Sequence, residues 1–118
     1  MENNAKEMVR IAYDALDEKL GCDIEILKID EISVVADYMV IASGDNQNQI
    51  TAMTDLAEEK LAQAGYINKR IEGNKNSTWI LMDYGDVIIH VFSKEDRLFY
   101  DLERIWRDGK KVDRAELD

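Results

Sequence analysis

The residues best suited to chemistry in this sequence are aspartates next to apolar segments. Asp83 and Asp86 flank a turn between two runs rich in Val and Ile, and Asp30 and Asp37 precede another apolar run. Carboxylate oxygens are the ligands that Mg²⁺ prefers, so these residues could serve a metal-dependent enzyme. Aspartate is also frequent in turns and at strand ends, where it bonds to the local backbone. We favour this structural role and assign no metal site.

Other catalytic residue types are scarce. His90 is the only histidine, and a histidine inside an apolar run is usually a packed or surface residue, so we assign it no catalytic role. No serine has the nucleophile-elbow pattern, and no glycine-rich phosphate loop is present. Cys22 is the only cysteine, which excludes an internal disulfide and a Cys-rich zinc site, and we expect it to be buried or half-buried. The sequence therefore predicts no catalytic residue and no cofactor.

The composition is that of an acidic globular protein. The chain has 118 residues, of which 46% are hydrophobic and 34% charged, so one domain with a sizeable core is expected. No apolar run is long enough to span a membrane, and the first residues do not form a signal peptide, so we expect a cytoplasmic protein. The net charge of −10 would repel phosphate backbones. It predicts a basic partner and no specific nucleic-acid binding.

The segment from Trp79 to Phe92 predicts a β-hairpin. Its apolar runs are rich in β-formers, and Gly85 with its neighbouring aspartates supplies the turn. Alternation places Trp79, Leu81 and Asp83 on one face of the first strand, and Ile80 and Met82 on the other. Because both faces are apolar, the hairpin is either covered on both sides or presents an apolar face to a partner.

The remaining elements alternate along the chain. Apolar residues at helical spacing predict helices over 5–20 and 47–64, and the stop signals are Gly21, in a left-handed cap, and Gly65. Ser93 resembles the cap of a third helix, which would end at Gly109. Strands are predicted over 23–29, 38–42 and 67–71, the second central and the third at an edge.

This order of elements predicts an α/β fold. A single domain over residues 1–109 would contain a mixed sheet of about five strands with flanking helices. The strand at 38–42, the second helix and the strand at 67–71 could form a crossover unit. Residues 110–118 are predicted to be a polar C-terminal tail.

Several segments in order give the chain a resemblance to a known family. The match covers nearly the whole sequence, and its motifs are Ile32–Gly44, Gln49, Glu72-Gly73, Trp79–Phe92 and Arg97–Trp106. Together they resemble the ribosomal silencing factor family, also called Iojap-like. Departures are minor: Met39 stands where an aromatic residue is common, and residues 45–48 are unusually rich in amides.

The resemblance implies a nucleotidyltransferase-like fold that lacks the catalytic motif, and binding in place of catalysis. Members of the family bind the large ribosomal subunit through ribosomal protein fourteen at the intersubunit face, and they sterically block joining of the small subunit. Repression of translation would follow. A basic ribosomal protein suits the acidic charge, and interface aromatics often dominate binding energy. The residues expected to bind the partner are Trp79, Leu81, Asp83, Tyr84, Asp86 and His90.

Two alternatives stay open on the sequence alone. One is a metal-dependent nucleotidyltransferase-like enzyme that uses Asp30, Asp37, Asp83 or Asp86, although no Gly-Ser pair precedes closely spaced strand carboxylates. The other is a homodimer in which the apolar hairpin face pairs with itself. Four basic residues lie around the end of the last predicted helix, and the sequence does not decide whether they contact ribosomal RNA. We favour the simpler interpretation, that their positive charges stabilise the negative end of the helix dipole. They are Arg104, Arg107, Lys110 and Lys111.

Overall fold

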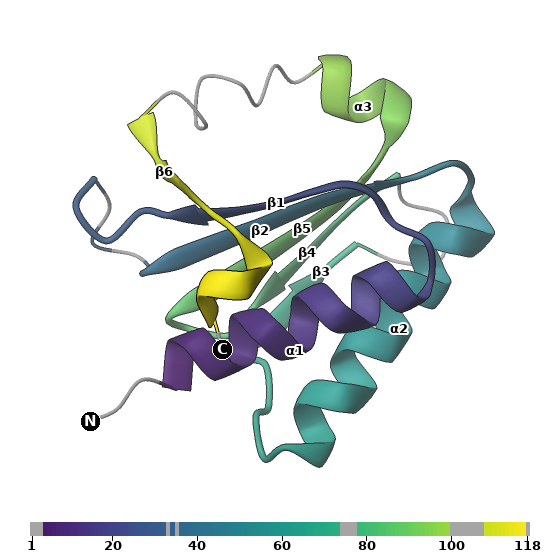
Figure 1. The fold of residues 1–118 in the computed structure, drawn as a ribbon. Helices are drawn as coiled ribbons and strands as arrows, with labels where there is room; N and C mark the ends of the chain where they lie inside the picture. Colours follow the sequence, from purple (N-terminus) through teal and green to yellow (C-terminus); the bar gives the residue numbers. More distant parts are fainter. Residues whose placement is uncertain (1–3, 33, 35, 74–77, 100–107, 118) are drawn as a thin grey trace.

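The computed structural model describes residues 4–32, 34, 36–73, 78–99 and 108–117, which form a sheet with helices on both sides (Figure 1). The helices α1 and α2 cover one side of the sheet, here called the first face, and α3 lies beyond the opposite side, the second face. The helices are α1 (Asn4–Glu18), α2 (Gln47–Gln63) and α3 (Lys94–Phe99), with a 3-10 turn η1 (Arg114–Leu117). The strands are β1 (Cys22–Lys28), β2 (Tyr38–Gly44), β3 (Arg70–Glu72), β4 (Trp79–Asp83), β5 (Val87–Ser93) and β6 (Lys110–Val112).

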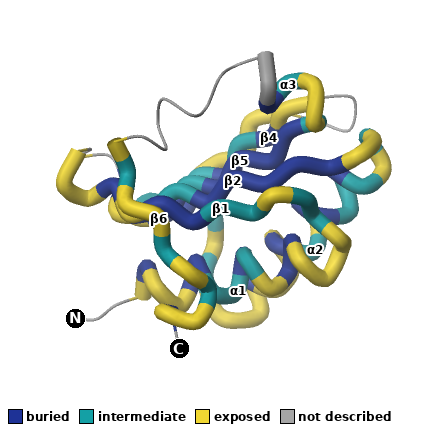
Figure 2. Tube along the Cα trace, turned by 45° about the horizontal axis from the view of Figure 1, so that its top comes forward, coloured by how far each residue is buried: buried dark blue, intermediate teal, exposed yellow. Residues whose placement is uncertain are grey.

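The described sheet is mixed and has the strand order β3-β4-β5-β2-β1-β6. β2 and β5 pair in parallel at its centre, and the other pairs are antiparallel. Figure 2 shows that these two central strands are largely buried, as expected for the continuous apolar run that begins at Tyr38. β3 lies at one edge, as predicted. It runs parallel to β2, so the segment through α2 is a crossover that passes β5 and β4. The predicted α/β fold is confirmed.

The main core lies between the first face and the two long helices. Each helix has an apolar stripe at the predicted spacing, and each stripe packs against the inward side chains of the central strands. Burial of these stripes provides most of the driving force that fixes the helices on the sheet. The buried helical residues are Ala5, Met8, Val9, Ala12, Ala15 and Leu16 in α1, and Ile50, Met53, Thr54, Ala57 and Leu61 in α2.

The chain reverses sharply where α1 ends. The Leu20 N–H donates to the Asp17 carbonyl at 2.9 Å, and the Gly21 N–H donates to the Leu16 carbonyl at 2.9 Å. This is a Schellman motif, which needs one left-handed residue. Leu20 takes that conformation, with φ of 63°, so the assignment to Gly21 is wrong by one position. A Cβ at Gly21 would lie 2.7 Å from Met53 Cε and 3.0 Å from the Leu16 carbonyl oxygen, so a side chain there would force the end of Met53 to move.

Gln49 ties the start of α2 to the end of α1. Its Nε2 donates to the carbonyls of Lys19 (3.0 Å) and Leu20 (2.9 Å), and its Oε1 accepts from the Asp45 N–H at 2.6 Å. The Asn46 side chain caps the same helix by accepting from the Gln49 N–H at 2.9 Å. One amide side chain therefore satisfies carbonyls that the helix end leaves unpaired.

Residues 110–112 depart from the predicted polar tail. They form β6, which pairs with β1 and gives the described sheet its sixth strand. The following turn returns to α1: Leu117 is buried in the main core, and the Arg114 guanidinium binds both carboxylate oxygens of Asp14 at 2.8 and 2.9 Å. Lys110 and Lys111 thus lie in a strand, opposite Lys28 and Leu27, two and three residues after the helical Asp108. Arg104 and Arg107 lie outside the described residues.

α3 begins where Ser93 predicts it. The Ser93 hydroxyl accepts from the Asp96 N–H at 3.1 Å, as an N-cap should. Arg97 is buried and donates to the Ser43 hydroxyl at 2.7 Å, which joins α3 to the end of β2. Burial lowers the pKa of Arg97. The predicted continuation of this helix to Gly109 falls on residues 100–107, which lie outside the described residues.

Candidate partner-binding surface

The hairpin of β4 and β5 has the alternation that the sequence predicts. Ile80 and Met82 are buried against the first face, whereas Trp79, Leu81 and Asp83 lie on the second face and are partly exposed. The turn forms around Gly85, which has φ of 86° and donates its N–H to Asp83 Oδ1 at 2.8 Å. This hydrogen bond is the turn role expected for Asp83.

Three aromatic rings meet on the second face. The register sets Trp79 opposite Phe92 and Leu81 opposite His90, so side chains of both strands share this side. The Trp79 ring stacks on Phe92 with centroids 4.9 Å apart, and the His90 ring lies 5.8 Å from Phe92. Trp79 is 37% exposed, while Phe92 is fully buried. The cluster therefore presents the tryptophan to solvent on a rigid aromatic base.

A hydrogen bond fixes the exposed ring. Trp79 Nε1 donates to His90 Nδ1 at 3.1 Å. The acceptor nitrogen must be unprotonated, so the neutral imidazole carries its proton on Nε2. Burial lowers the pKa of His90 from its usual 6.5 to about 4, which keeps the ring neutral at physiological pH. His90 is thus a positioning residue for Trp79.

Charged side chains border this surface at the turn and at the sheet edge. The Arg70 Nε lies 3.2 Å from Glu72 and 3.8 Å from Asp83, all on the second face. Asp86 is exposed in the turn, and its backbone carbonyl accepts from the N–H groups of Asp37 (2.8 Å) and Tyr38 (3.1 Å). The Asp83 side chain thus holds the turn, and the Asp86 backbone joins the turn to the start of β2.

The structure brings together four of the six predicted partner-binding residues. Trp79, Leu81, Asp83 and His90 share the second face, with His90 beneath the tryptophan. Tyr84 is only 7% exposed and packs in the main core on the other side, where burial raises its pKa. The prediction that Tyr84 is an exposed aromatic contact for the partner does not agree with this buried position.

Sequence reasoning missed two features of the surface. Phe92 supports the tryptophan ring, and Met39 with Ile88 packs onto the second apolar cluster of this face. The signal for Phe92 was present: a two-stranded register around Gly85 puts positions 79 and 92 opposite each other. The packing of Met39 from the neighbouring strand β2 can be predicted only when the strand order of the sheet is known, and the hairpin sequence does not reveal that order. The buried members of this cluster are Leu27, Ile29, Ala36, Ile41 and Phe92.

The aspartates considered for the alternative of a metal-dependent enzyme make local structural contacts. Within the described part of the chain, no group of three or more His, Cys, Asp or Glu side chains is arranged to hold a metal ion. Asp30 lies 3.8 Å from the Lys28 ammonium, and Asp83 serves the turn. Cys22 is half-buried, as expected. Across the same described residues, none of the helices combines the length and apolar character needed to cross a membrane.

Comparisons with known proteins agree with one another. Residues 2–118 match the family described as "Ribosomal silencing factor during starvation". A ribosomal silencing factor of Bacillus subtilis is 37% identical over 110 residues, covering 93% of each chain. One of Zymomonas mobilis is 43% identical over 107 residues, or 90% of this chain and 80% of that one. A crystal structure of a Chromobacterium violaceum protein superposes with a TM-score of 0.84 at 33% identity, covering 96% of this chain and 92% of the other.

Proposed function

This chain belongs to the ribosomal silencing factor family, and from that membership we propose that it binds the large ribosomal subunit and sterically blocks joining of the small subunit. The proposed contact is ribosomal protein fourteen at the intersubunit face. Repression of translation in the cytoplasm would be the result. Steric exclusion needs no cofactor and no catalytic step.

The observation that carries the proposal is the aromatic surface of the hairpin. Trp79 is large, partly exposed and held in one orientation by Phe92 and His90. A rigid aromatic side chain loses little conformational entropy when a partner covers it, and such residues often contribute most of an interface's affinity. Leu81 extends the apolar area, and Asp83 stands at its border. This arrangement fits an apolar anchor with a charged rim.

Charge supports a basic protein as the partner. The net charge of −10 raises the encounter rate with a positive surface and opposes approach to bare phosphate backbones. Asp83 and Asp86 would lie at the rim of the interface, where charges act mainly on association rate. Tyr84 would support the turn from inside and would not touch the partner.

Cosedimentation with purified large subunits, with and without small subunits, tests the proposal. The parent protein should travel with large subunits and reduce the yield of joined ribosomes. Trp79→Ala should weaken binding about tenfold or more, since truncation of an interface aromatic often costs about 2 kcal/mol. Ile67→Ala is the control, because Ile67 is an apolar side chain that is 74% exposed in the loop between α2 and β3 and is outside the predicted partner-binding set.

A circular dichroism melt must accompany each variant, because Trp79 also packs on Phe92. Leu81→Ala provides a second probe of the same surface that leaves the Trp79–His90 hydrogen bond in place. Equal binding by both variants and the parent would refute the assignment of this face. Analytical ultracentrifugation of the free protein decides whether the apolar face pairs with a second copy instead.

A further inference from the structure

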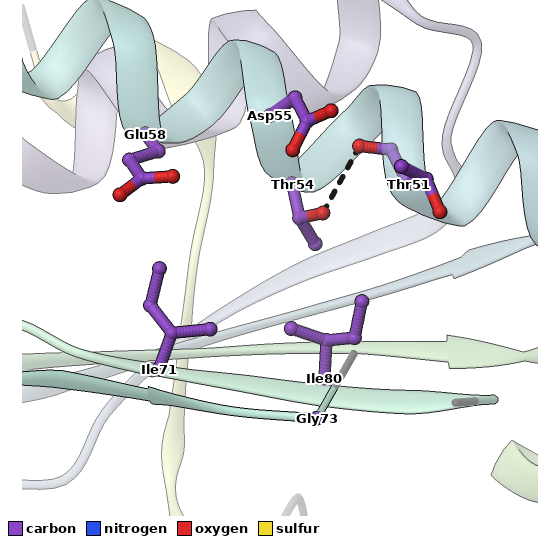
Figure 3. Close-up of a pocket in the computed structure, with 7 residues that line it drawn as sticks. All are labelled: Thr51, Thr54, Asp55, Glu58, Ile71, Gly73 and Ile80. Carbon is purple, nitrogen blue, oxygen red and sulfur yellow. Dashed lines mark hydrogen bonds between the residues drawn. The ribbon is translucent and has the colours of Figure 1, made fainter. Parts of the chain in front are cut away.

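Charged residues of β3 border the aromatic surface of the hairpin on the second face. The register sets Arg70 opposite Asp83, and Glu72 opposite Leu81. Ile71 points from β3 toward α2 (Figure 3), so alternation directs its two neighbours in the strand to the opposite side, the second face. A guanidinium is thus placed within the charged rim of the surface that we propose for partner binding.

The Asp83 carboxylate has a separate contact for each of its two oxygens. Oδ1 accepts from the Gly85 N–H at 2.8 Å and holds the hairpin turn. The other oxygen, Oδ2, lies 3.8 Å from Arg70 Nε. A partner cation that approaches this carboxylate from the second face would therefore meet the oxygen that Arg70 already faces.

Arg70 has a second carboxylate within reach. Its Nε lies 3.2 Å from Glu72 Oε2, closer than to Asp83, and its side chain is 63% exposed. Ion pairs between exposed side chains contribute little free energy, because water and salt screen them. The guanidinium can therefore leave Asp83 at little cost and stay paired with Glu72.

We propose that Arg70 competes with a basic side chain of the partner protein for Asp83, and so acts as a specificity-determining residue of the surface. Binding would move the guanidinium fully onto Glu72 and place a partner lysine or arginine on Asp83 Oδ2. Two cations at one carboxylate oxygen would repel each other, so a close contact requires this exchange. Only a cation that contacts Asp83 more closely than Arg70 does would displace it, so the competition favours a well-placed basic side chain over diffuse positive charge. The inference rests on the proposed function, which supplies the basic partner.

The test measures association rate constants with purified large subunits by stopped-flow fluorescence, at low and high salt with magnesium held constant. Arg70→Gln should associate about threefold faster than the parent at low salt, because Asp83 is then open to the partner, and the gain should shrink as salt screens the rim charges. A general charge effect would have the opposite sign, since the phosphates of ribosomal RNA repel a more acidic protein.

Arg10→Gln is the matched control. Arg10 is also a partly exposed arginine 3.8 Å from a carboxylate, that of Glu7, but it lies on α1, which covers the first face. The substitution removes the same charge without touching the proposed surface, so it should not make association faster.

A double variant shows whether the gain depends on Asp83. Asp83→Asn removes the charge but keeps an amide oxygen that can accept from the Gly85 N–H, so the turn is retained. In that background Arg70→Gln should give no gain over Arg10→Gln. A gain that persists would overturn the proposal in favour of a local field effect. Slower association of the single variant Arg70→Gln would overturn it in favour of a contact between Arg70 and ribosomal RNA.

The outcomes separate this inference from the proposed function. If the parent binds large subunits and Arg70→Gln associates at the parent rate, the competition is refuted and the proposed function stands. If the parent does not bind, both are refuted. Circular dichroism melts check each variant, and Asp83→Ser, which keeps a hydroxyl acceptor for the turn, replaces Asp83→Asn if the latter melts early.

Discussion

Acidification from pH about 7 to about 5 is expected to destabilise the fold through His90. The imidazole is 8% exposed, and burial lowers its pKa from 6.5 to about 4. In the unfolded chain the same ring takes up a proton near pH 6.5. Between these values the unfolded state binds more protons than the folded state, so stability falls as the pH is lowered through this window. Above pH about 7 the contribution of His90 to the pH dependence vanishes.

The size of the effect follows from the two pKa values. At pH about 5 the unfolded histidine is almost fully protonated and the folded one is mostly neutral, which gives a loss of about 2 kcal/mol. Protonation of the folded ring would also remove the acceptor of the Trp79 hydrogen bond. A loss of this size is large compared with the total stability of a small domain.

The single histidine makes the assay direct. Its ring carbon-bound protons give the only histidine signals in an NMR spectrum, so their pH titration reports the folded pKa without assignment. Urea unfolding at both pH values then gives the change in free energy for the parent and for His90→Gln, which has no titrating ring. Carboxylates contribute equally to both proteins, so the difference isolates His90.

A titration midpoint close to 6.5 would refute this prediction, because it would mean that the ring is solvated. An equal loss of stability in His90→Gln and in the parent on acidification would refute it as well. A nitrogen spectrum with the proton on Nδ1 would contradict the Trp79 hydrogen bond even if the pKa were low.

Three further variants test the packing of the fold by urea unfolding. Gln49→Glu should lower the free energy of unfolding by about 2 kcal/mol, because a carboxylate would face the carbonyls of Lys19 and Leu20. The control is Asn48→Asp, which also replaces an amide with a carboxylate but at an exposed position, and it should change the free energy of unfolding little. Leu20→Gly should stabilise by about 0.5–1 kcal/mol, since Leu20 is 77% exposed and left-handed; an unchanged or lower stability would contradict this. Leu117→Ala should lower the free energy of unfolding by about 2 kcal/mol, whereas Asp14→Asn, at an exposed ion pair, should lower it by less than about 1 kcal/mol. An unchanged free energy for Leu117→Ala would mean that burial of Leu117 does not stabilise the core.

Local patterns predict most of the fold. Apolar spacing locates α1 and α2, the run from Tyr38 identifies a central strand, and Gly85 with its aspartates locates the hairpin turn. These signals succeed because each depends on neighbours in sequence. β6 was missed because its three residues are mostly charged, and only pairing with β1 makes them a strand.

The candidate site shows the same limit. Alternation separates Trp79 and Leu81 from Ile80 and Met82, and that separation is correct. Tyr84 was chosen as an interface aromatic by its residue type, and its burial in the main core depends on how the turn directs the side chain, which strand alternation does not describe. The burial of His90 and its role beneath Trp79 depend on the cross-strand register and on the packing of Phe92, which no single strand encodes.

The central parallel pair also has a consequence for the order in which the chain folds. Tyr38 lies opposite Val87, and Ile26 lies opposite Val112, so the sheet joins segments that are far apart in sequence. The hairpin closes through a short turn and should form early. Pairing of β2 with β5 requires closure of a long loop, which costs conformational entropy, and β6 can pair only after β1 is in place. Pulse-labelling hydrogen exchange should therefore protect hairpin amides first and β6 amides last. Simultaneous protection would show that the sheet forms in one concerted step.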